Sequence, residues 1–358
     1  MSALSRSWKV PGSVDAIADC AIAINANDTQ STDDYDYCMR KLYIAPPIDE
    51  VQLARKAQPS VDAFEGRMPT AKELAALSEL HDIDLATMAF YQAARAADSN
   101  RSFVDDVDRQ PLDQRTDRRI TLLILPALFY QEHPEVGGDG AHIASVARAC
   151  GIDARVVPTV SRGGIDDDLP IICKALQEIR DGEIWVMTLS KGAAEWRCLL
   201  QEHREEIPCE RITTWFNVGG LPHGCHLVDL MTRSPLRRAR TRAFCKIIRM
   251  EYRSFLEFGT ATPRLREPLQ MPGHIRVINV VGAPLTSHVQ KSMQTRFLML
   301  KHLGPNDGMV LLPEALWLPG HVYPVLGADH FFRGSQISSL LYQLFAHVFT
   351  APRQAGFI

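Results

Sequence analysis

The sequence predicts an α/β protein built on a mostly parallel β-sheet that is covered by helices. From residue 120 onward, short β-branched or apolar runs alternate with segments that have helical spacing of apolar residues. These runs are compact and apolar, as strands buried on both faces of a parallel sheet require. Six successive strands are predicted: "ITLLILPA" (120–127), "ARVVPTV" (154–160), "EIWVMTL" (183–189), "ITTWFNVGG" (212–220), "HIRVINVVG" (274–282) and "HVYPVLG" (321–327).

Helical spacing of apolar residues fills the gaps between the first four strands. The three segments run from Gly140 to Cys150, from Leu169 to Arg180 and from Ala193 to His203. After the fourth strand the alternation stops for about 50 residues, 225–273. An insertion there follows the carboxyl end of a strand, where open α/β sheets bind ligands, so we expect it to form a cap over a site.

The N-terminal third has a different pattern. "NANDTQSTDDYDYC" is polar and acidic and is typical of a loop, and a strand is expected near "KLYIAPP". "TAKELAALSELHDIDLATMAFYQAARAA" is helical, begins with Thr70 and Glu73 in capping-box spacing, and is expected to break near Asp82. We therefore expect a mainly helical extension over residues 1–115 and the α/β domain over residues 116–358.

Composition sets limits on the function classes. A formal net charge of −3 argues against a general polyanion binder, and 46% apolar residues are ordinary for a globular protein. The eight cysteines are spread singly without a C-x-x-C pair, so we expect reduced thiols. Neither a signal-peptide h-region nor an apolar span of membrane length is present in the sequence, which predicts a cytoplasmic protein.

One short stretch, "VMTLSKGAAEW" (186–196), combines a strand end with a serine and small residues. A strand that delivers a serine to a tight turn, followed by a helix rich in Gly and Ala, is the pattern of a nucleophile elbow. The usual form is G-x-S-x-G, so Gly192 fits and Thr188 departs from it. The alternative is that Ser190 merely caps the helix. Lys191 places a positive charge beside the serine that could attract an acidic substrate, but we expect this side chain to be solvated.

A serine nucleophile needs a base and a carboxylate that orients it. Downstream, "GPNDGMVLL" (304–312) places Asp307 in a turn, and "YPVLGADHFF" (323–332) places His330 on a loop after a strand. Serine, acid and histidine in this chain order are what the predicted topology requires. Asp329 is the nearest rival for the acid, and Asp229 and Glu314 are more distant ones.

With "TLSKG", "NDGMV" and "GADHFF" together, residues of about 118–348 resemble an α/β-hydrolase of the lipase or esterase type. The resemblance implies that Ser190 is the nucleophile, that His330 is the general base and that Asp307 orients it. It also implies an oxyanion hole from the backbone N–H of Lys191 and one from the loop after the first strand. Ala127 replaces the usual glycine of that loop, which leaves Leu128 or Phe129 as the second donor. Phe129, Leu189 and Phe331 are expected to contact substrate, and no cofactor is expected.

Three other patterns have ordinary structural interpretations. "HGCH" (223–226) lacks a second ligand cluster for a metal, so these residues are expected to line the mouth of the pocket. "SRGGIDDDL" (161–169) lacks the features of a phosphate or calcium loop and is expected to cap the next helix. Residues 233–258 form a basic amphipathic pattern. We favour a cap helix with a solvated basic face over contact with a membrane or nucleic acid.

The sequence therefore predicts a serine hydrolase that cleaves a hydrophobic carboxylic ester. Acyl transfer and thioester hydrolysis on the same residues are close alternatives. A non-catalytic protein of the same fold, which binds a hydrophobic ligand or a partner, is the alternative from another class, supported by the departures at Thr188 and Ala127.

Overall fold

A computed structural model describes residues 48–333 and 336–351. The predicted loop at "NANDTQSTDDYDYC" and the predicted strand near "KLYIAPP" lie outside this range. Six parallel strands form one sheet in the order β2-β1-β3-β4-β5-β6. They are β1 (Ile120–Leu125), β2 (Asp153–Val156), β3 (Glu183–Leu189), β4 (Ile212–Val218), β5 (Arg276–Ala283) and β6 (His321–Leu326).

All six predicted strands are confirmed, with differences at their ends. The second strand stops at Val156, four residues before the predicted end, because Pro158 interrupts the segment and residues 157–160 pass into the next loop. Every residue of β1 and β3 is buried, which confirms that these central strands are covered on both faces. Helices therefore have to lie on both sides of the sheet.

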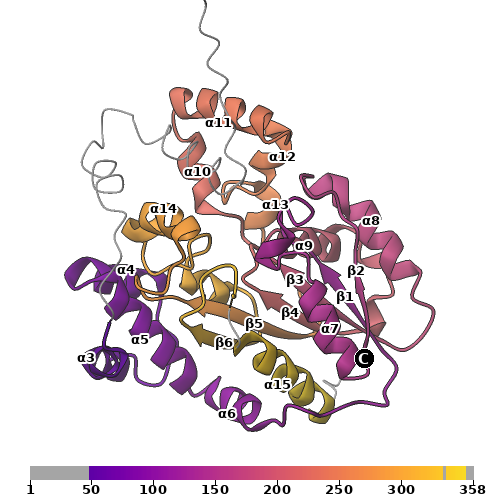
Figure 1. The fold of residues 1–358 in the computed structure, drawn as a ribbon, viewed down its shortest axis with the longest axis horizontal. Coiled ribbons are helices and arrows are strands. Elements are labelled where there is room, and N and C mark those ends of the chain that lie inside the picture. Colours follow the sequence, from indigo (N-terminus) through magenta and orange to yellow (C-terminus); the bar gives the residue numbers. More distant parts are fainter. Residues whose placement is uncertain (1–47, 334–335, 352–358) are drawn as a thin grey trace, which may run out of the picture.

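Alternate side chains of β1 define the two helical layers. Leu123 and Leu125 belong to one buried cluster, which includes residues of α8 (Ile165–Gln177) and α9 (Gly192–Glu202). Leu122 and Ile124 belong to another, with α6 (Arg101–Arg109), α7 (Ala141–Ala149) and α15 (Gln336–Thr350). Figure 1 shows the sheet between these layers. The core is thus two apolar layers separated by the strands, as an α/β sheet requires.

The described N-terminal helices pack against the β6 edge of the sheet. They are α3 (Glu50–Asp62), α4 (Ala71–Leu80) and α5 (Ile83–Ala96), which precede α6. Thr70 and Glu73 form the predicted capping box at the start of α4, and the predicted break follows at His81 and Asp82. Helix α5 contacts both β6 and α3, so it connects this helical group to the sheet.

Four helices fill the chain between β4 and β5: α10 (His226–Thr232), α11 (Pro235–Ile247), α12 (Tyr252–Glu257) and α13 (Pro263–Arg266). In Figure 1, α10, α11 and α12 stand together at the end of the molecule away from α15. Helix α14 (Lys291–Leu300) follows β5 and contacts α10. We call α10 to α12 the cap helices.

The prediction of one amphipathic helix over residues 233–258 is wrong. Helix α11 ends at Ile247, and Arg249 adopts a left-handed backbone with φ of 54° before α12 begins. Within α11 itself the burial also differs from the expected stripe, since Ile247 is 64% exposed while Arg237 is buried. No helix within residues 48–333 or 336–351 is long and apolar enough to cross a membrane.

Candidate active site

Ser190 lies at the sharp turn between β3 and α9. Its φ is 49°, in the left-handed region that residues with a side chain rarely adopt. Such backbone strain persists where surrounding structure enforces it, and a strand-to-helix turn with this strain presents the serine hydroxyl at the top of the sheet. The predicted elbow geometry is therefore present at Ser190.

Small side chains let α9 approach the strands closely at this turn. A Cβ atom on Gly192 would lie 2.7 Å from the carbonyl oxygen of Leu125 in β1. A Cβ atom on Gly220 would lie 2.5 Å from Cβ of Ala193. Real Cβ atoms do not come this close to other atoms, so the Gly and Ala residues after Ser190 meet a steric requirement of the turn.

Thr188 occupies the position where the elbow motif usually has glycine. Its buried hydroxyl accepts a hydrogen bond from Nε1 of Trp215 at 2.9 Å and donates to Oδ1 of Asn217 at 3.3 Å. Nδ2 of Asn217 in turn donates to Oδ1 of Asn279 at 3.0 Å. These polar side chains form a row across β3, β4 and β5, and the hydroxyl of Thr188 is satisfied both as acceptor and as donor by side chains of β4.

The structure brings together the three residues that the sequence predicts to act together. Nε2 of His330 is 3.0 Å from Oγ of Ser190, and Nδ1 of His330 is 2.9 Å from Oδ2 of Asp307. The backbone N–H of His330 also donates to the carbonyl oxygen of Asp307 at 2.9 Å, which joins the two loops. Hydroxyl, imidazole and carboxylate thus form one hydrogen-bonded chain, as in a Ser-His-Asp triad.

The second oxygen of Asp307 fixes the orientation of its carboxylate. Oδ1 accepts hydrogen bonds from the backbone N–H groups of Met309 and Val310, both at 2.8 Å. Because both of these donors hold Oδ1, Oδ2 is left facing the imidazole of His330. The turn "NDGMV" therefore supplies both the carboxylate and the groups that aim it.

The rival carboxylates have other partners. Asp329 accepts hydrogen bonds from the N–H groups of Gln290 and Phe331, both at 3.1 Å. Asp229 accepts from the hydroxyl of Thr260 at 2.6 Å. An oxygen of Glu314 lies 2.7 Å from Nε2 of His226. Among the described residues, Asp307 alone of the four candidates hydrogen-bonds the imidazole of His330.

Hydrogen bonding distinguishes the two candidates for the second oxyanion donor. The N–H of Phe129 donates to the carbonyl oxygen of Ser161 at 2.8 Å, so it is already used. Within the part of the chain that the structure describes, the N–H groups of Leu128 and Lys191 have no hydrogen-bond acceptor, and both residues line the same cavity as Ser190. The geometry favours Leu128 over Phe129 as the partner of Lys191.

The prediction that the Lys191 side chain is solvated is wrong. The side chain is 1% exposed, and Nζ lies 2.6 Å from Oδ2 of Asp168 and 2.7 Å from Oε1 of Glu195. Nζ also donates to the carbonyl oxygen of Val160 at 3.1 Å. The spacing of Lys191 and Glu195 in helix α9 is i,i+4, a signal present in the sequence, whereas Asp168 comes from α8 and requires the fold. The lysine is an internal ion-pair partner rather than a group that attracts substrate.

Glu195 is fully buried, and desolvation raises its pKa from 4.5 to about 8, with the nearby charge of Asp168 adding to the effect. Lys191 lowers it again, but less than burial raises it. Glu195 is therefore a neutral acid at neutral pH, beside the ion pair of Lys191 and Asp168.

Glutamine in place of Glu195 is expected to flatten the pH dependence of stability. A carboxyl whose pKa is raised by folding contributes stability that is full below pH 4.5 and is lost as pH rises toward about 8. Glu195→Gln stays neutral, so relative to wild type it should gain on the order of a few kcal/mol of unfolding free energy between pH 5 and 8.5. Urea unfolding of both proteins at the two pH values measures this, and parallel pH profiles would show that Glu195 titrates normally.

A cavity of about 550 Å³ opens above Ser190. Its lining includes all three residues predicted to contact substrate, Phe129, Leu189 and Phe331. Further apolar residues that the sequence analysis did not identify come from α10 to α12 and from the segments that follow β4 and β5: Leu221, Leu227, Val228, Met231, Phe244, Phe255, Phe258, Met293 and Met309. The sequence shows that these residues are apolar, but the helical pattern of the cap does not show which of them face Ser190.

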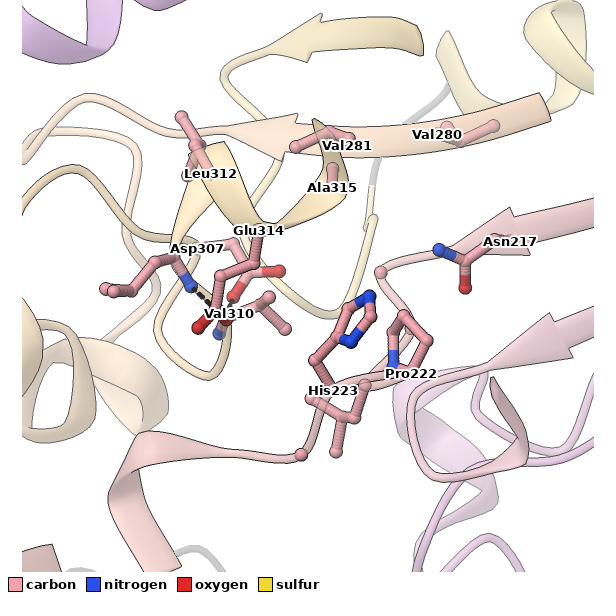
Figure 2. Close-up of a pocket in the computed structure, with 15 residues that line it drawn as sticks. Asn217, Pro222, His223, Val280, Val281, Asp307, Val310, Leu312, Glu314 and Ala315 are labelled. Atoms are coloured by element: carbon pink, nitrogen blue, oxygen red, sulfur yellow. Dashed lines mark hydrogen bonds between the residues drawn. The ribbon is translucent and has the colours of Figure 1, made fainter. Parts of the chain in front are cut away.

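A second cavity, of about 20 Å³, is lined in part by the turn that carries Asp307. Figure 2 shows Asp307, Val310 and Glu314 on one side of it and Pro222 and His223 on the other. Burial and the positive charge of Arg197 lower the pKa of His223 to about 4, so this imidazole is neutral at neutral pH.

The "HGCH" residues do not converge on a metal site. His223 contacts Arg197 at 3.0 Å, Cys225 lines the large cavity, and His226 contacts Glu314. Within residues 48–333 and 336–351 no group of three His, Cys, Asp or Glu residues is arranged to hold a metal ion. The "SRGGIDDDL" segment forms the start of α8, where the N–H of Gly164 donates to Asp167 at 2.8 Å, as predicted for a helix cap.

Comparison with solved structures gives the same architecture. A metagenomic carboxyl esterase, MGS0156, matches with a TM-score of 0.51 and 18% identity over 66% of this chain and 77% of the esterase. The lipase BlEst2 of Bacillus licheniformis in its propeptide form matches with a TM-score of 0.50 and 17% identity. That match covers 69% of this chain and 54% of the lipase chain. No protein-family model and no curated protein sequence matches the chain. At these identities the likeness is one of fold.

Proposed function

Because this chain has the α/β-hydrolase fold, we propose that it is a serine hydrolase that cleaves a carboxylic ester with an apolar acyl group. The observation that carries the proposal is the chain of hydrogen bonds from Ser190 through His330 to Asp307 at the base of an apolar cavity. A hydroxyl needs a neighbouring base to act as a nucleophile, and this arrangement supplies one together with its orienting carboxylate.

In the proposed mechanism, Oγ of Ser190 attacks the ester carbonyl while Nε2 of His330 takes its proton. The negative charge that forms on the carbonyl oxygen is stabilised by the N–H groups of Lys191 and Leu128. Protonated His330 then gives its proton to the leaving alcohol, and Asp307 stabilises the imidazolium during both steps. His330 then takes a proton from a water molecule that attacks the acyl-enzyme, and it returns this proton to Oγ of Ser190 as the acid is released.

The cavity supports an apolar acyl group as the part of the substrate that is recognised. Side chains from the cap helices and from the core surround the space beside Ser190 with Leu, Met, Val and Phe residues. Burial of a hydrocarbon chain among such side chains contributes roughly 0.8 kcal/mol per methylene group. Chain length is therefore the property of the ester to which the rate should be most sensitive.

A fluorophosphonate probe and a panel of p-nitrophenyl esters from acetate to palmitate test the proposal. We expect the probe to form a covalent adduct on Ser190, located by mass spectrometry, and the hydrolysis rate to pass through an optimum along the panel. Probe labelling with little hydrolysis, but with acyl transfer to an added alcohol or with thioester cleavage, would favour the related activities. A protein that neither labels at Ser190 nor hydrolyses any ester would instead be a binder of hydrophobic ligands.

A further inference from the structure

Lys191 has a backbone N–H at the active site and a buried ammonium group elsewhere. The N–H is one of the two proposed oxyanion donors. The ammonium contacts Asp168 at 2.6 Å, Glu195 at 2.7 Å and the carbonyl oxygen of Val160 at 3.1 Å. Asp168 and Glu195 are fully buried, so these contacts are protected from water and hold their geometry well.

The ion pair holds both backbone groups of Val160. Oδ1 of Asp168 accepts a hydrogen bond from the N–H of Val160 at 2.6 Å, while Nζ of Lys191 donates to the carbonyl oxygen of the same residue. Val160 is 46% exposed, so its side chain packs only in part. The polar contacts with Lys191 and Asp168 restrain the backbone here, together with the N–H of Gly163, which donates to the carbonyl oxygen of Val160 at 2.8 Å.

The residues on either side of Val160 hold the loop that carries Leu128. The carbonyl oxygen of Ser161 accepts from the N–H of Phe129 at 2.8 Å, and that of Thr159 accepts from the hydroxyl of Tyr130 at 2.9 Å. Phe129 has a left-handed backbone with φ of 62°, which the bond to Ser161 helps to maintain. The peptide that presents the Leu128 N–H is therefore tied to residues 159–161.

We propose that the Lys191 side chain is a positioning group that sets the separation of the two oxyanion donors. Its own residue carries the first N–H, and through Val160, Ser161 and Phe129 it fixes the loop that carries the second. This inference rests on the proposed function. Oxyanion donors act in the transition state only when they are held in advance at hydrogen-bond distance from the oxyanion, and a misplacement of about 1 Å can cost about 10²-fold in rate.

Stability alone is a weak explanation for this ion pair. Buried ion pairs are often no more stabilising than apolar residues of similar size, because desolvation of both charges offsets their attraction. A role in positioning makes a separate prediction. Loss of the positioning group should lower kcat and the affinity for a transition-state analogue, while substrate binding is largely unchanged.

Asp168→Asn tests the inference. The replacement keeps the size of the side chain but weakens its hold on Lys191 and Val160, and the fold can be retained because Glu195 can ionise to balance the charge of Lys191. We expect kcat to fall about 10- to 100-fold with KM within about threefold of wild type. The affinity for an alkylboronic acid, which forms a tetrahedral adduct with the serine, should fall by a similar factor.

A matched replacement of a buried carboxylate serves as the control. Glu183→Gln removes the buried partner of Arg118 at the other end of β3. It should keep kcat within about threefold of wild type. If Asp168→Asn keeps wild-type kcat and boronate affinity, or if Glu183→Gln loses as much as Asp168→Asn, the inference is overturned.

Two further comparisons keep the result interpretable. If Asp168→Asn does not fold, the double variant Lys191→Met with Asp168→Asn replaces it. This variant removes both buried charges beside neutral Glu195, and it should show the same loss of kcat. If the wild-type protein shows no hydrolysis that depends on Ser190, the proposed function and this inference are overturned together. If the wild type is active and a folded Asp168→Asn or double variant has the same kcat as wild type, the inference alone is overturned.

Discussion

Ser190→Ala is expected to lower kcat for the best p-nitrophenyl ester by about 10⁶-fold, because it removes the attacking atom of the proposed mechanism. Oγ of Ser190 lies 3.0 Å from Nε2 of His330, and among the described residues this is the hydroxyl that the imidazole contacts. A residual rate of about 10³-fold over the reaction in water should remain, since the cavity and the oxyanion donors are unchanged. Steady-state kinetics on purified protein measures both values.

Ser254→Ala provides the control for this result. Ser254 is a buried serine on α12 that does not line the cavity, so its removal tests the loss of a buried hydroxyl as such. We expect its kcat to stay within about twofold of wild type. A Ser190→Ala protein that keeps more than a tenth of the wild-type rate would mean that another group or a water molecule attacks the ester.

The meeting of Ser190, Asp307 and His330 could be predicted from the sequence because it depends on local chemistry and on chain order. Ser190 is marked by the small residues that its turn requires, and Asp307 by a turn whose N–H groups aim its carboxylate. The order of the strands along the chain places both residues and His330 at the same end of the sheet. Local pattern and topology together are therefore sufficient to predict that these three side chains meet.

The features that the sequence does not predict are mainly contacts between segments that are distant in sequence. Nothing near Lys191 in the sequence shows that Asp168 will meet its ammonium, because that depends on how α8 packs beside α9. The choice between Leu128 and Phe129 likewise depends on a hydrogen bond to Ser161, on another loop. In the cap, one left-handed residue, Arg249, separates α11 from α12, and helical periodicity does not reveal such a break.

The contacts of Thr188 explain why its departure from the G-x-S-x-G motif is compatible with the fold. By the motif alone, a threonine in place of glycine weakens the case for an elbow. In the structure its hydroxyl is held between Trp215 and Asn217, and the close approach of helix to strand is made at Gly192 instead. A small residue is thus required where the turn closely approaches a neighbouring strand, and not equally at each position of the motif.

Asp307→Asn is expected to lower kcat by about 10⁴-fold while the fold is retained. Oδ1 of Asp307 accepts two backbone hydrogen bonds, from Met309 and Val310, so the amide oxygen of the replacement should keep this place. The amide nitrogen then faces Nδ1 of His330. It donates to that atom, so the proton of the neutral imidazole moves to Nε2, which can no longer take the proton of Ser190. Hydrolysis kinetics and the rate of fluorophosphonate labelling should fall together.

Asp329→Asn is the matched control, since Asp329 is the adjacent residue to His330 and is also buried. Desolvation raises the pKa of Asp329, and its carboxylate accepts hydrogen bonds from Gln290 and Phe331 rather than from the imidazole. We expect this replacement to keep kcat within about tenfold of wild type and to cost about 1 kcal/mol of unfolding free energy through weaker bonds to those N–H groups. Equal losses of kcat in the two variants would contradict the assignment, because they would mean that the imidazole does not depend on Asp307 in particular. A large loss in Asp307→Asn alone would show that one carboxylate, held by its own turn, determines which nitrogen of His330 carries the proton.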